Sequence, residues 1–179
     1  MTSPAVVPIL ETPRLRLRPL RESDLERWAA VCADPAVLRY IGGRALSREE
    51  TWRRILATTG AWAMLGFGYW AVERLEDGLM IGHVGFADFK REILPPLDGR
   101  PEMGWVLAPE AHGRGYASEA VAAGLAWADE ALGATEIVAI IDPGNAASIR
   151  VAEKAGFARA ETAAYNGDQI LIFRRPPVR

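Results

Sequence analysis

The hydrophobic and polar positions in the first third of the chain predict one strand followed by two helices. Leucine and arginine alternate over residues 14–18, which is typical of a half-buried strand with leucines on one face and arginines on the other. Residues 23–26 and 47–50 each have the form of a capping box, followed by apolar residues at helical spacing. Because a capping box marks a helix start, two helices are expected after the strand.

The middle of the chain predicts antiparallel strands. Residues 67–73 and 79–89 are rich in aromatic and β-branched side chains, and a turn that ends at Gly78 joins them. This pattern predicts a hairpin. The proline-containing segment 90–101 interrupts regular structure, and a short apolar strand follows over residues 102–107.

The last third of the chain predicts a helix followed by a buried strand. Apolar residues recur at helical spacing over residues 118–132, and Gly133 is the expected C-terminal stop. Residues 136–141 form a nearly continuous apolar run, typical of a strand buried on both faces. A parallel crossover is implied, because the helix separates two strands.

Turn and cap residues indicate the C-terminal elements. Asn145 can cap a helix that Gly156 and Phe157 would end, and Asn166-Gly167 is a strong hairpin signal between two strands. The predicted order β-α-α-β-β-β-α-β-α-β-β describes one mixed α/β sheet with flanking helices.

Composition narrows the class of protein. With 179 residues, 50% of them hydrophobic and 25% charged, the chain is expected to fold as one globular domain over residues 1–179. A net charge of −2 provides no basic field for nucleic acid. Residues 1–10 lack the features of a signal peptide and no apolar run reaches 18 residues, so a cytoplasmic protein without a membrane span is expected.

Metal and disulfide chemistry are not expected. Cys32 is the only cysteine, which excludes an intramolecular disulfide and a cysteine metal cluster. The two histidines, His83 and His112, are far apart in sequence and have no helical partner histidine, so no metal site is predicted.

Candidate chemistry concentrates in the glycine-containing segment 112–117, between a predicted strand and a predicted helix. Its glycines allow a ligand to approach the backbone closely, and the free amides and dipole of the helix start favour an anion. A phosphate cradle is one interpretation. A glycine loop that merely caps the helix is the other, since a lone glycine loop is weak evidence.

Two common phosphate-binding patterns fit this segment poorly. A P-loop requires lysine after its second glycine, where this chain has Tyr116. A dinucleotide fingerprint requires a third glycine where Ser118 stands, and a tight turn that residues 108–113 do not allow. Walker-type nucleotide hydrolysis is therefore excluded, and an NAD-dependent enzyme is disfavoured.

A third pattern fits better. Gly115 and Ala117 occupy the last two fixed places of Q/R-x-x-G-x-G/A, and His112 replaces the leading Gln or Arg. This motif resembles the acyl-CoA motif of the GNAT acetyltransferases. Further segments are similar, in sequence and order, to the ribosomal-protein N-terminal acetyltransferase branch: TPRLRLR at 12–18, EMGWVL at 102–107, GYASEA at 115–120, NAAS at 145–148 and GF at 156–157. The resemblance spans about residues 10–175 and implies a GNAT fold with a mostly antiparallel central sheet.

The resemblance implies a site for acetyl-CoA between strands 102–107 and 136–141. Amides near the end of the first strand would hold the pantetheine and polarise the thioester, and the glycine loop would hold the diphosphate. The implied cofactor-binding residues are Val106, Leu107, His112, Gly113, Arg114, Gly115, Tyr116, Ala117, Ser118, Asn145 and Ser148.

The implied reaction is direct attack by an amine on acetyl-CoA, without a covalent enzyme intermediate. Glu102 is the candidate acceptor of the amine proton, through a water molecule, and Ser148 the candidate hydrogen-bond donor to the departing sulfur. Structural alternatives stay open: Glu102 as a solvated strand-end carboxylate, Ser148 as a first-turn hydroxyl and Asn145 as a helix cap. Asp142 is interpreted as a turn residue.

The acceptor side of the reaction has several candidate features. Tyr40, Trp62, Tyr69 and Trp70 could line an amine pocket, although such aromatic residues more often belong to the core. The acceptor amine is a protein N-terminus or a small molecule, and a homodimer is neither predicted nor excluded. The rival function from another class is a noncatalytic acyl-CoA-binding or sensing domain.

Overall fold

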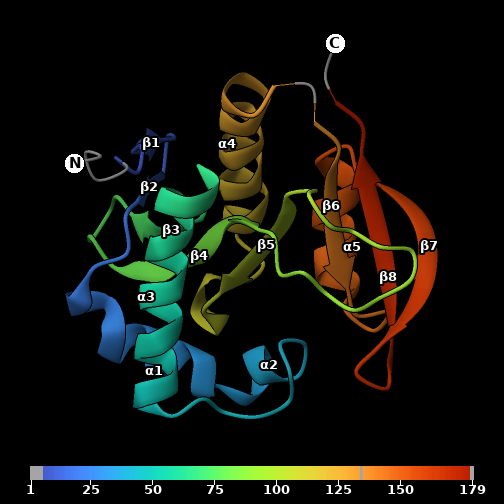
Figure 1. Cartoon of the computed structure of the whole chain (residues 1–179). Coiled ribbons are helices and arrows are strands. Elements are labelled where there is room, and N and C mark those ends of the chain that lie inside the picture. Colours follow the sequence, from blue (N-terminus) through green and yellow to red (C-terminus); the bar gives the residue numbers. More distant parts are fainter. Residues whose placement is uncertain (1–5, 134, 178–179) are drawn as a thin grey trace.

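The computed structural model describes residues 6–133 and 135–177 and contains one eight-stranded sheet with helices on both faces (Figure 1). The strands follow the order β1-β2-β3-β4-β5-β6-β8-β7, and only β5 and β6 pair in parallel. The strands are β1 (Leu10–Glu11), β2 (Leu15–Arg18), β3 (Tyr69–Arg74), β4 (Met80–Ala87), β5 (Glu102–Leu107), β6 (Ile137–Ile141), β7 (Ala158–Tyr165) and β8 (Asp168–Arg175). The helices are α1 (Leu25–Ala33), α2 (Pro35–Leu38), α3 (Arg48–Leu65), α4 (Tyr116–Ala131) and α5 (Ala146–Lys154).

The predicted fold class is confirmed: the sheet is mixed, mostly antiparallel and flanked by helices. Two short elements were not predicted from the sequence, the two-residue strand β1 and the single-turn helix α2. Both are too short to produce a periodic hydrophobic pattern. Residues 1–5, half of the segment 1–10 that lacks signal-peptide features, lie outside the described residues.

Most of the predicted caps and turns are present. Ser47 and Glu50 form the expected capping box of α3, and Asn145 Oδ1 accepts the Ser148 N–H at 3.1 Å. Phe157 N–H donates to the Ala152 carbonyl, as the Schellman stop after α5 requires. The hairpin at residues 166–167 joins β7 to β8, and both residues have the positive φ of a type I′ turn.

The prediction of a capping box at residues 23–26 is wrong. A 3₁₀ turn, Glu22–Asp24, precedes α1, and Asp24 Oδ2 accepts the Arg21 N–H at 2.8 Å. The same carboxylate accepts two hydrogen bonds at 2.8 Å from the buried Arg18 guanidinium, which also donates to Glu73 at 2.5 Å. Arg18 is therefore buried together with its own counter-ions, whereas the preceding arginine of β2, Arg16, stays partly exposed.

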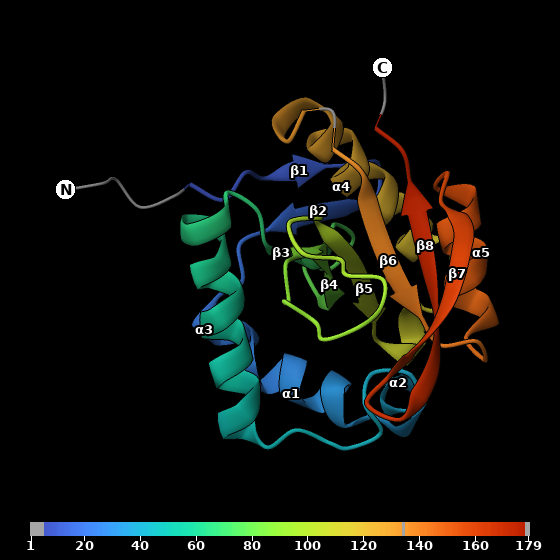
Figure 2. The same ribbon diagram turned by 45° about the vertical axis from the view of Figure 1, so that its right-hand side comes forward.

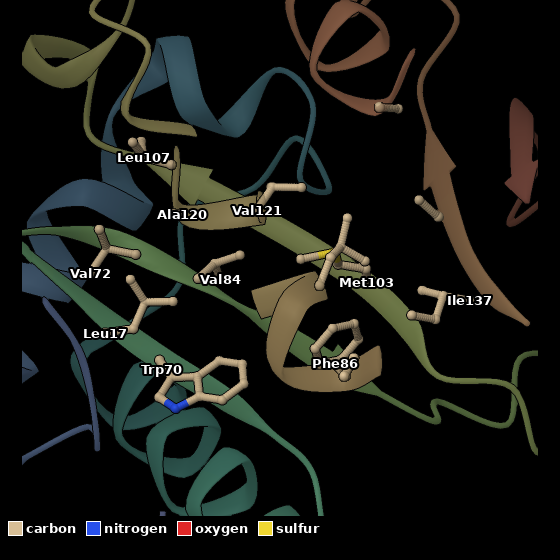
Figure 3. Close-up of a cluster of buried hydrophobic side chains, with 14 of the residues drawn as sticks. Leu17, Trp70, Val72, Val84, Phe86, Met103, Leu107, Ala120, Val121 and Ile137 are labelled. Atoms are coloured by element: carbon tan, nitrogen blue, oxygen red, sulfur yellow. The ribbon is translucent and has the colours of Figure 1, made fainter. Parts of the chain in front are cut away.

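Each face of the sheet carries its own hydrophobic cluster. Helices α4 and α5 cover one face, where Ala120 and Val121 of α4 lie over β4 and β5 near Val84 and Met103 (Figure 3). Helix α1 covers the other face through Leu25 and Trp28, together with the first part of α3. The 88–101 loop covers another part of this second face, because its Ile93 and Leu97 form a cluster with residues of β6 and β8. Figure 2 shows the loop in front of β5 and beside β6. Backbone groups at the centre of the sheet can thus be reached only where strands separate.

Within the described residues, no helix is long and apolar enough to span a membrane. The same residues contain no group of three or more His, Cys, Asp or Glu side chains that could hold a metal ion.

Candidate active site

The parallel strands β5 and β6 pair at one end only. Their single aligned pair is Glu102 with Val138, and the Val138 N–H donates to the Pro101 carbonyl at 3.1 Å. Beyond this pair the strands diverge, and a gap opens toward the carboxyl ends of both strands. Figure 1 shows the two strands separating toward their arrowheads.

The hydrogen-bond pattern of β5 determines which of its amides face the gap. Ala108 N–H donates to the Ile81 carbonyl at 2.8 Å, so Ala108 points toward β4. Successive residues of an antiparallel strand direct their backbone groups alternately toward the partner strand and away from it. Val106 therefore also bonds to β4, whereas the N–H groups of Trp105 and Leu107 face the gap. His112 Nε2 lies 2.8 Å from the Leu107 carbonyl oxygen, which agrees with this direction.

Free amides also converge at the start of α4. Gly115 is the N-cap residue, with a φ of 79° that a side chain would strain. Glu119 N–H is bonded to the Gly115 carbonyl. The preceding N–H groups, of Tyr116 to Ser118, therefore have no acceptor within the helix. Together with the helix dipole they attract an anion.

A cavity of about 480 Å³ joins these two sets of amides. Its floor is the end of β5 and the 111–118 loop, one wall is α5, and α2 lies across it. Tyr40, just after α2, donates a 3.3 Å hydrogen bond to the Gly144 carbonyl in the β6–α5 turn. The lining residues are Ala36, Val37, Tyr40, Ile41, Trp105, Val106, Leu107, Ala111, His112, Gly113, Gly115, Tyr116, Ala117, Ser118, Asn145, Ala147, Ser148, Arg150, Val151 and Lys154.

The structure brings together nearly all residues that the sequence suggested for cofactor binding. Every one of them lines the cavity except Arg114, whose backbone carbonyl is bonded to Arg14. Sequence reasoning missed Trp105, the α2 segment and the basic residues Arg150 and Lys154. The last two could have been found, because Ala147, Arg150 and Lys154 recur at helical spacing on one face of α5.

Glu102 lies apart from this group. It is at the opposite end of β5, where β5 and β6 are still paired, and it does not line the cavity. Both of its carboxylate oxygens accept hydrogen bonds from Arg91, each at 2.7 Å, and its side chain is 11% exposed. Three residues of β5 separate Glu102 from Val106, so the two are roughly 13 Å apart along the strand.

Tyr69 lies on the α1 face of the sheet between these two positions. A Cβ built on Gly104 would lie 2.3 Å from the Tyr69 hydroxyl oxygen, so the glycine makes room for the ring. The Tyr69 ring packs against His83 at a centroid distance of 4.6 Å, and His83 packs against Trp28 at 4.3 Å. Trp62 and Trp70 belong to the hydrophobic cluster under α4, as expected for core residues.

Burial keeps this aromatic stack neutral. It lowers the pKa of His83 to about 3, with a smaller contribution from the charge of Arg54. Burial also raises the pKa of the Tyr69 hydroxyl well above its usual value. At neutral pH the imidazole is thus uncharged and the phenol protonated.

Cys32 does not take part in the site. It is buried within the cluster under α1, and burial raises the pKa of its thiol to about 11. A protonated thiol outside the cavity cannot serve as a nucleophile of this site.

Comparisons with known proteins agree with this geometry. The family described as Acetyltransferase (GNAT) domain matches residues 14–158. The chain belongs to the GNAT acetyltransferase family. The uncharacterized N-acetyltransferase YoaA of Bacillus subtilis is 32% identical over 151 residues, which cover 84% of this chain and 82% of YoaA. As a member of this family, the chain is an N-acetyltransferase that uses acetyl-CoA.

Solved GNAT structures have the same fold. A Bordetella pertussis protein described as a GNAT-family acetyltransferase has a TM-score of 0.84 and 32% identity, covering 94% of this chain and 99% of that one. RimL, a ribosomal L7/L12 α-N-protein acetyltransferase solved with coenzyme A, has a TM-score of 0.77 and 17% identity, covering 94% and 98%. At that identity the similarity to RimL concerns the fold alone.

Proposed function

We propose that the chain transfers an acetyl group from acetyl-CoA to a primary amine in a ternary complex. The cavity carries the proposal, because it connects the amides of the diverging strand β5 with the anion-binding start of α4. Acetyl-CoA has the matching chemistry, a pantetheine arm with amide groups at one end and a diphosphate at the other. The residues proposed from the sequence for binding it are retained except Arg114, which does not line the cavity, and Trp105 is added.

The backbone of β5 supplies the electrostatic part of this proposal. The N–H groups of Trp105 and Leu107 are directed into the gap and would donate to the pantetheine and to the thioester carbonyl oxygen. Amides held in place by a sheet stabilise negative charge that develops on that oxygen without reorganising. The Val106 N–H is bonded to β4, so Val106 contributes its side chain to the cavity and not a free amide.

Ser148 lies in the wall of the cavity, in the first turn of α5. Its backbone N–H is already bonded to Asn145, which fixes the position of the residue at the helix start. In the proposed reaction the hydroxyl donates a hydrogen bond to the sulfur as the thioester bond breaks, and solvent then supplies the proton.

The acceptor amine would approach from the α1 face of the sheet. Helices α4 and α5 cover the opposite face, whereas on the α1 face the Tyr69 hydroxyl lies over Gly104, next to Trp105. Glu102 shares this face, because residues 102, 104 and 106 alternate with those that point toward α4. We propose Glu102 as the acceptor of the amine proton through water, a role with which its ion pair to Arg91 competes.

The chemical class of the acceptor is a protein N-terminus or a small-molecule amine. RimL and FsC-acetyl coenzyme A-N(2)-transacetylase of Aspergillus fumigatus, which is 29% identical over 163 residues, are named for different acceptors. No metal is required for the proposed chemistry. The cytoplasm is the proposed compartment, where acetyl-CoA is available and an unpaired cysteine stays reduced.

The test combines binding with turnover. Acetyl-CoA should raise the thermal unfolding temperature, because a ligand present at 100 times its dissociation constant stabilises the native state by about 2.7 kcal/mol. CoA release should then be followed with a panel of peptides with free N-termini, amino acids and polyamines. Stabilisation without CoA release from any amine would favour the noncatalytic acyl-CoA-binding function, and the absence of both would contradict the proposal.

A further inference from the structure

We infer that Arg14 is a positioning residue that orients the diphosphate-binding loop for acetyl-CoA, an inference that rests on the proposed cofactor site. Arg14 precedes β2 and is 100 residues away from the loop in sequence. Its Nη1 nevertheless donates a 2.9 Å hydrogen bond to the backbone carbonyl of Arg114. Arg14 does not line the cavity, so its contact with the loop is made from outside.

The geometry of the peptide group connects this contact to the cavity. The Arg114 carbonyl and the Gly115 N–H belong to one planar trans peptide group, and in such a group the C=O and N–H point in opposite directions. When Arg14 holds the carbonyl on the outside, the Gly115 N–H is directed to the other side of the loop. Gly115 itself lines the cavity. The hydrogen bond to Arg14 thereby selects the orientation of an amide available to phosphate.

This orientation is not secured by the loop itself. Gly115 has a φ of 79° and Gly113 a φ of 71°, and glycine occupies many other backbone conformations at little cost. A Cβ on Gly115 would lie 3.5 Å from Arg14 Nη2, so the guanidinium packs directly against this residue. An external restraint is therefore expected to matter more here than in a loop without glycine.

Glu119 holds the Arg14 guanidinium in place. Its Oε2 lies 2.7 Å from Arg14 Nε and 2.6 Å from Nη2, and its Oε1 accepts from the Thr12 hydroxyl at 2.6 Å and from the Arg14 backbone N–H at 3.0 Å. We call the ion pair of Arg14 with Glu119 the clamp. Because Glu119 lies in the first turn of α4, the clamp joins the chain before β2 to the helix that begins at the loop. Arg14 also lies over the Tyr116 ring, 4.5 Å from its centroid.

The clamp and simple electrostatics predict opposite effects on CoA binding when Glu119 is removed. Glu119 places a negative charge near the proposed diphosphate site, so simple electrostatics predicts that its removal tightens CoA binding. Positioning predicts the opposite, because without Glu119 the Arg14 side chain loses its restraint. Similarly, Arg14→Lys keeps the positive charge but cannot bond to Glu119 and to the Arg114 carbonyl in the same forked geometry.

Calorimetric titration of the full chain with CoA tests the inference. Arg14→Ala and Glu119→Gln should each weaken CoA binding by about tenfold, the usual loss for a charge-assisted hydrogen bond, and Arg14→Lys should restore little of it. S-acetyl-pantetheine lacks the diphosphate, so its turnover should be unchanged in the same variants. Arg16→Ala is the matched control, since Arg16 is an exposed arginine of β2 that pairs with Glu11 and Glu73.

The outcomes separate the clamp from the function on which it rests. Wild-type CoA affinity in Arg14→Ala, or tighter binding in Glu119→Gln, would overturn the inference alone. If Arg14→Ala unfolds, the Arg14→Lys and Glu119→Gln titrations decide the question. Failure of the wild-type chain to bind CoA would instead overturn the proposed function. The clamp would then have no diphosphate-binding loop to orient.

Discussion

At the scale of single residues, neighbouring side chains and backbone groups decide which chemistry each candidate can perform. Ser148 lies in the wall of the cavity at the start of α5, where its hydroxyl can meet a ligand. Glu102 lies outside the cavity and both of its oxygens accept hydrogen bonds from Arg91. The two residues had equal standing as sequence candidates, and their surroundings now separate them.

Ser148→Ala is expected to lower turnover by about tenfold to a hundredfold, with little change in the dissociation constant of acetyl-CoA. A hydrogen bond to sulfur strengthens as charge develops, so its loss affects the transition state more than the bound cofactor. Steady-state rates and calorimetric titration of the same sample measure the two effects. Unchanged turnover would leave Ser148 as a helix-start hydroxyl, and weaker binding with intact turnover would make it a cofactor-binding residue.

Glu102→Gln separates a role of the carboxylate as proton acceptor from its role as the ion-pair partner of Arg91. If Glu102 accepts the amine proton, turnover at neutral pH should fall by about 10²-fold and recover as the pH rises, because free amine becomes abundant. The ion pair instead predicts a loss of stability of about 1 to 3 kcal/mol with an unaltered pH profile of turnover.

Arg91→Leu is the companion variant for this test, because it removes the same ion pair and keeps the carboxylate. We expect it to match Glu102→Gln in denaturant unfolding. If only Glu102→Gln loses turnover, Glu102 is the proton acceptor. If both variants keep wild-type turnover, water or another residue accepts the proton.

At the scale of elements, the site arises where two regular patterns end. Strands β5 and β6 separate after one aligned pair, which leaves alternate amides of β5 without a partner strand. Helix α4 begins at the same end of β5, after the 3₁₀ turn Pro109–Ala111. Each element alone has unsatisfied groups at its end, and a ligand that spans both satisfies them together.

Gly115→Val tests the start of α4. Valine at a φ of 79° is strained, and its Cβ would contact Arg14 Nη2, so the variant should lose most of the thermal stabilisation by acetyl-CoA. Gly133→Val is the matched control, because Gly133 has a φ of 67° at the other end of the same helix, with open space around a Cβ. Both variants should lose about 1 to 3 kcal/mol of stability from backbone strain. If both variants lost the thermal stabilisation by acetyl-CoA equally, the assignment of the loop before α4 as the diphosphate-binding site would be contradicted.

At the scale of the whole molecule, the sheet is covered on both faces and this decides the ionisation of groups in its middle. His83 is on the central strand β4, between Trp28 of α1 and Tyr69 of β3. Burial of its imidazole against these two aromatic rings, with a smaller contribution from the charge of Arg54, lowers its pKa to about 3. The native fold therefore favours neutral His83, although an unfolded chain would protonate it below about pH 6.5.

The pH dependence of stability should reveal this linkage. Between the unfolded pKa of about 6.5 and the native pKa the unfolded chain binds one more proton, so His83 lowers the free energy of unfolding as the pH falls, by up to about 1.4 kcal/mol per pH unit. His83→Phe keeps a ring in the stack and removes the proton site. Denaturant unfolding from pH 7 to pH 4 should therefore give a smaller loss of stability in the variant. Parallel curves for both proteins would show that His83 does not stay neutral in the native state.

The sequence by itself determined those features whose causes lie within a few residues of one another. The alternation in β2, the capping box of α3, the Asn145 cap, the stop at Gly156 and the Asn166-Gly167 hairpin all depend on local periodicity or local hydrogen bonds. The motif around Gly115 and Ala117 likewise identified the family. These signals were sufficient for the fold class and for most of the cavity lining.

Only the tertiary structure decided which side chains and backbone groups meet once the strands pair and the loops fold over the sheet. The expected capping box before α1 does not form, because Asp24 is bonded to the buried Arg18 guanidinium. Glu102 does not line the cavity, because it lies at the paired end of β5 and is bonded to Arg91. The direction of the Trp105 amide follows from the pairing of β5 with β4. Asp24 is only six residues from Arg18 and Glu102 eleven from Arg91, but local periodicity does not select these pairs. Close packing and strand register set each contact, and both are properties of the assembled sheet.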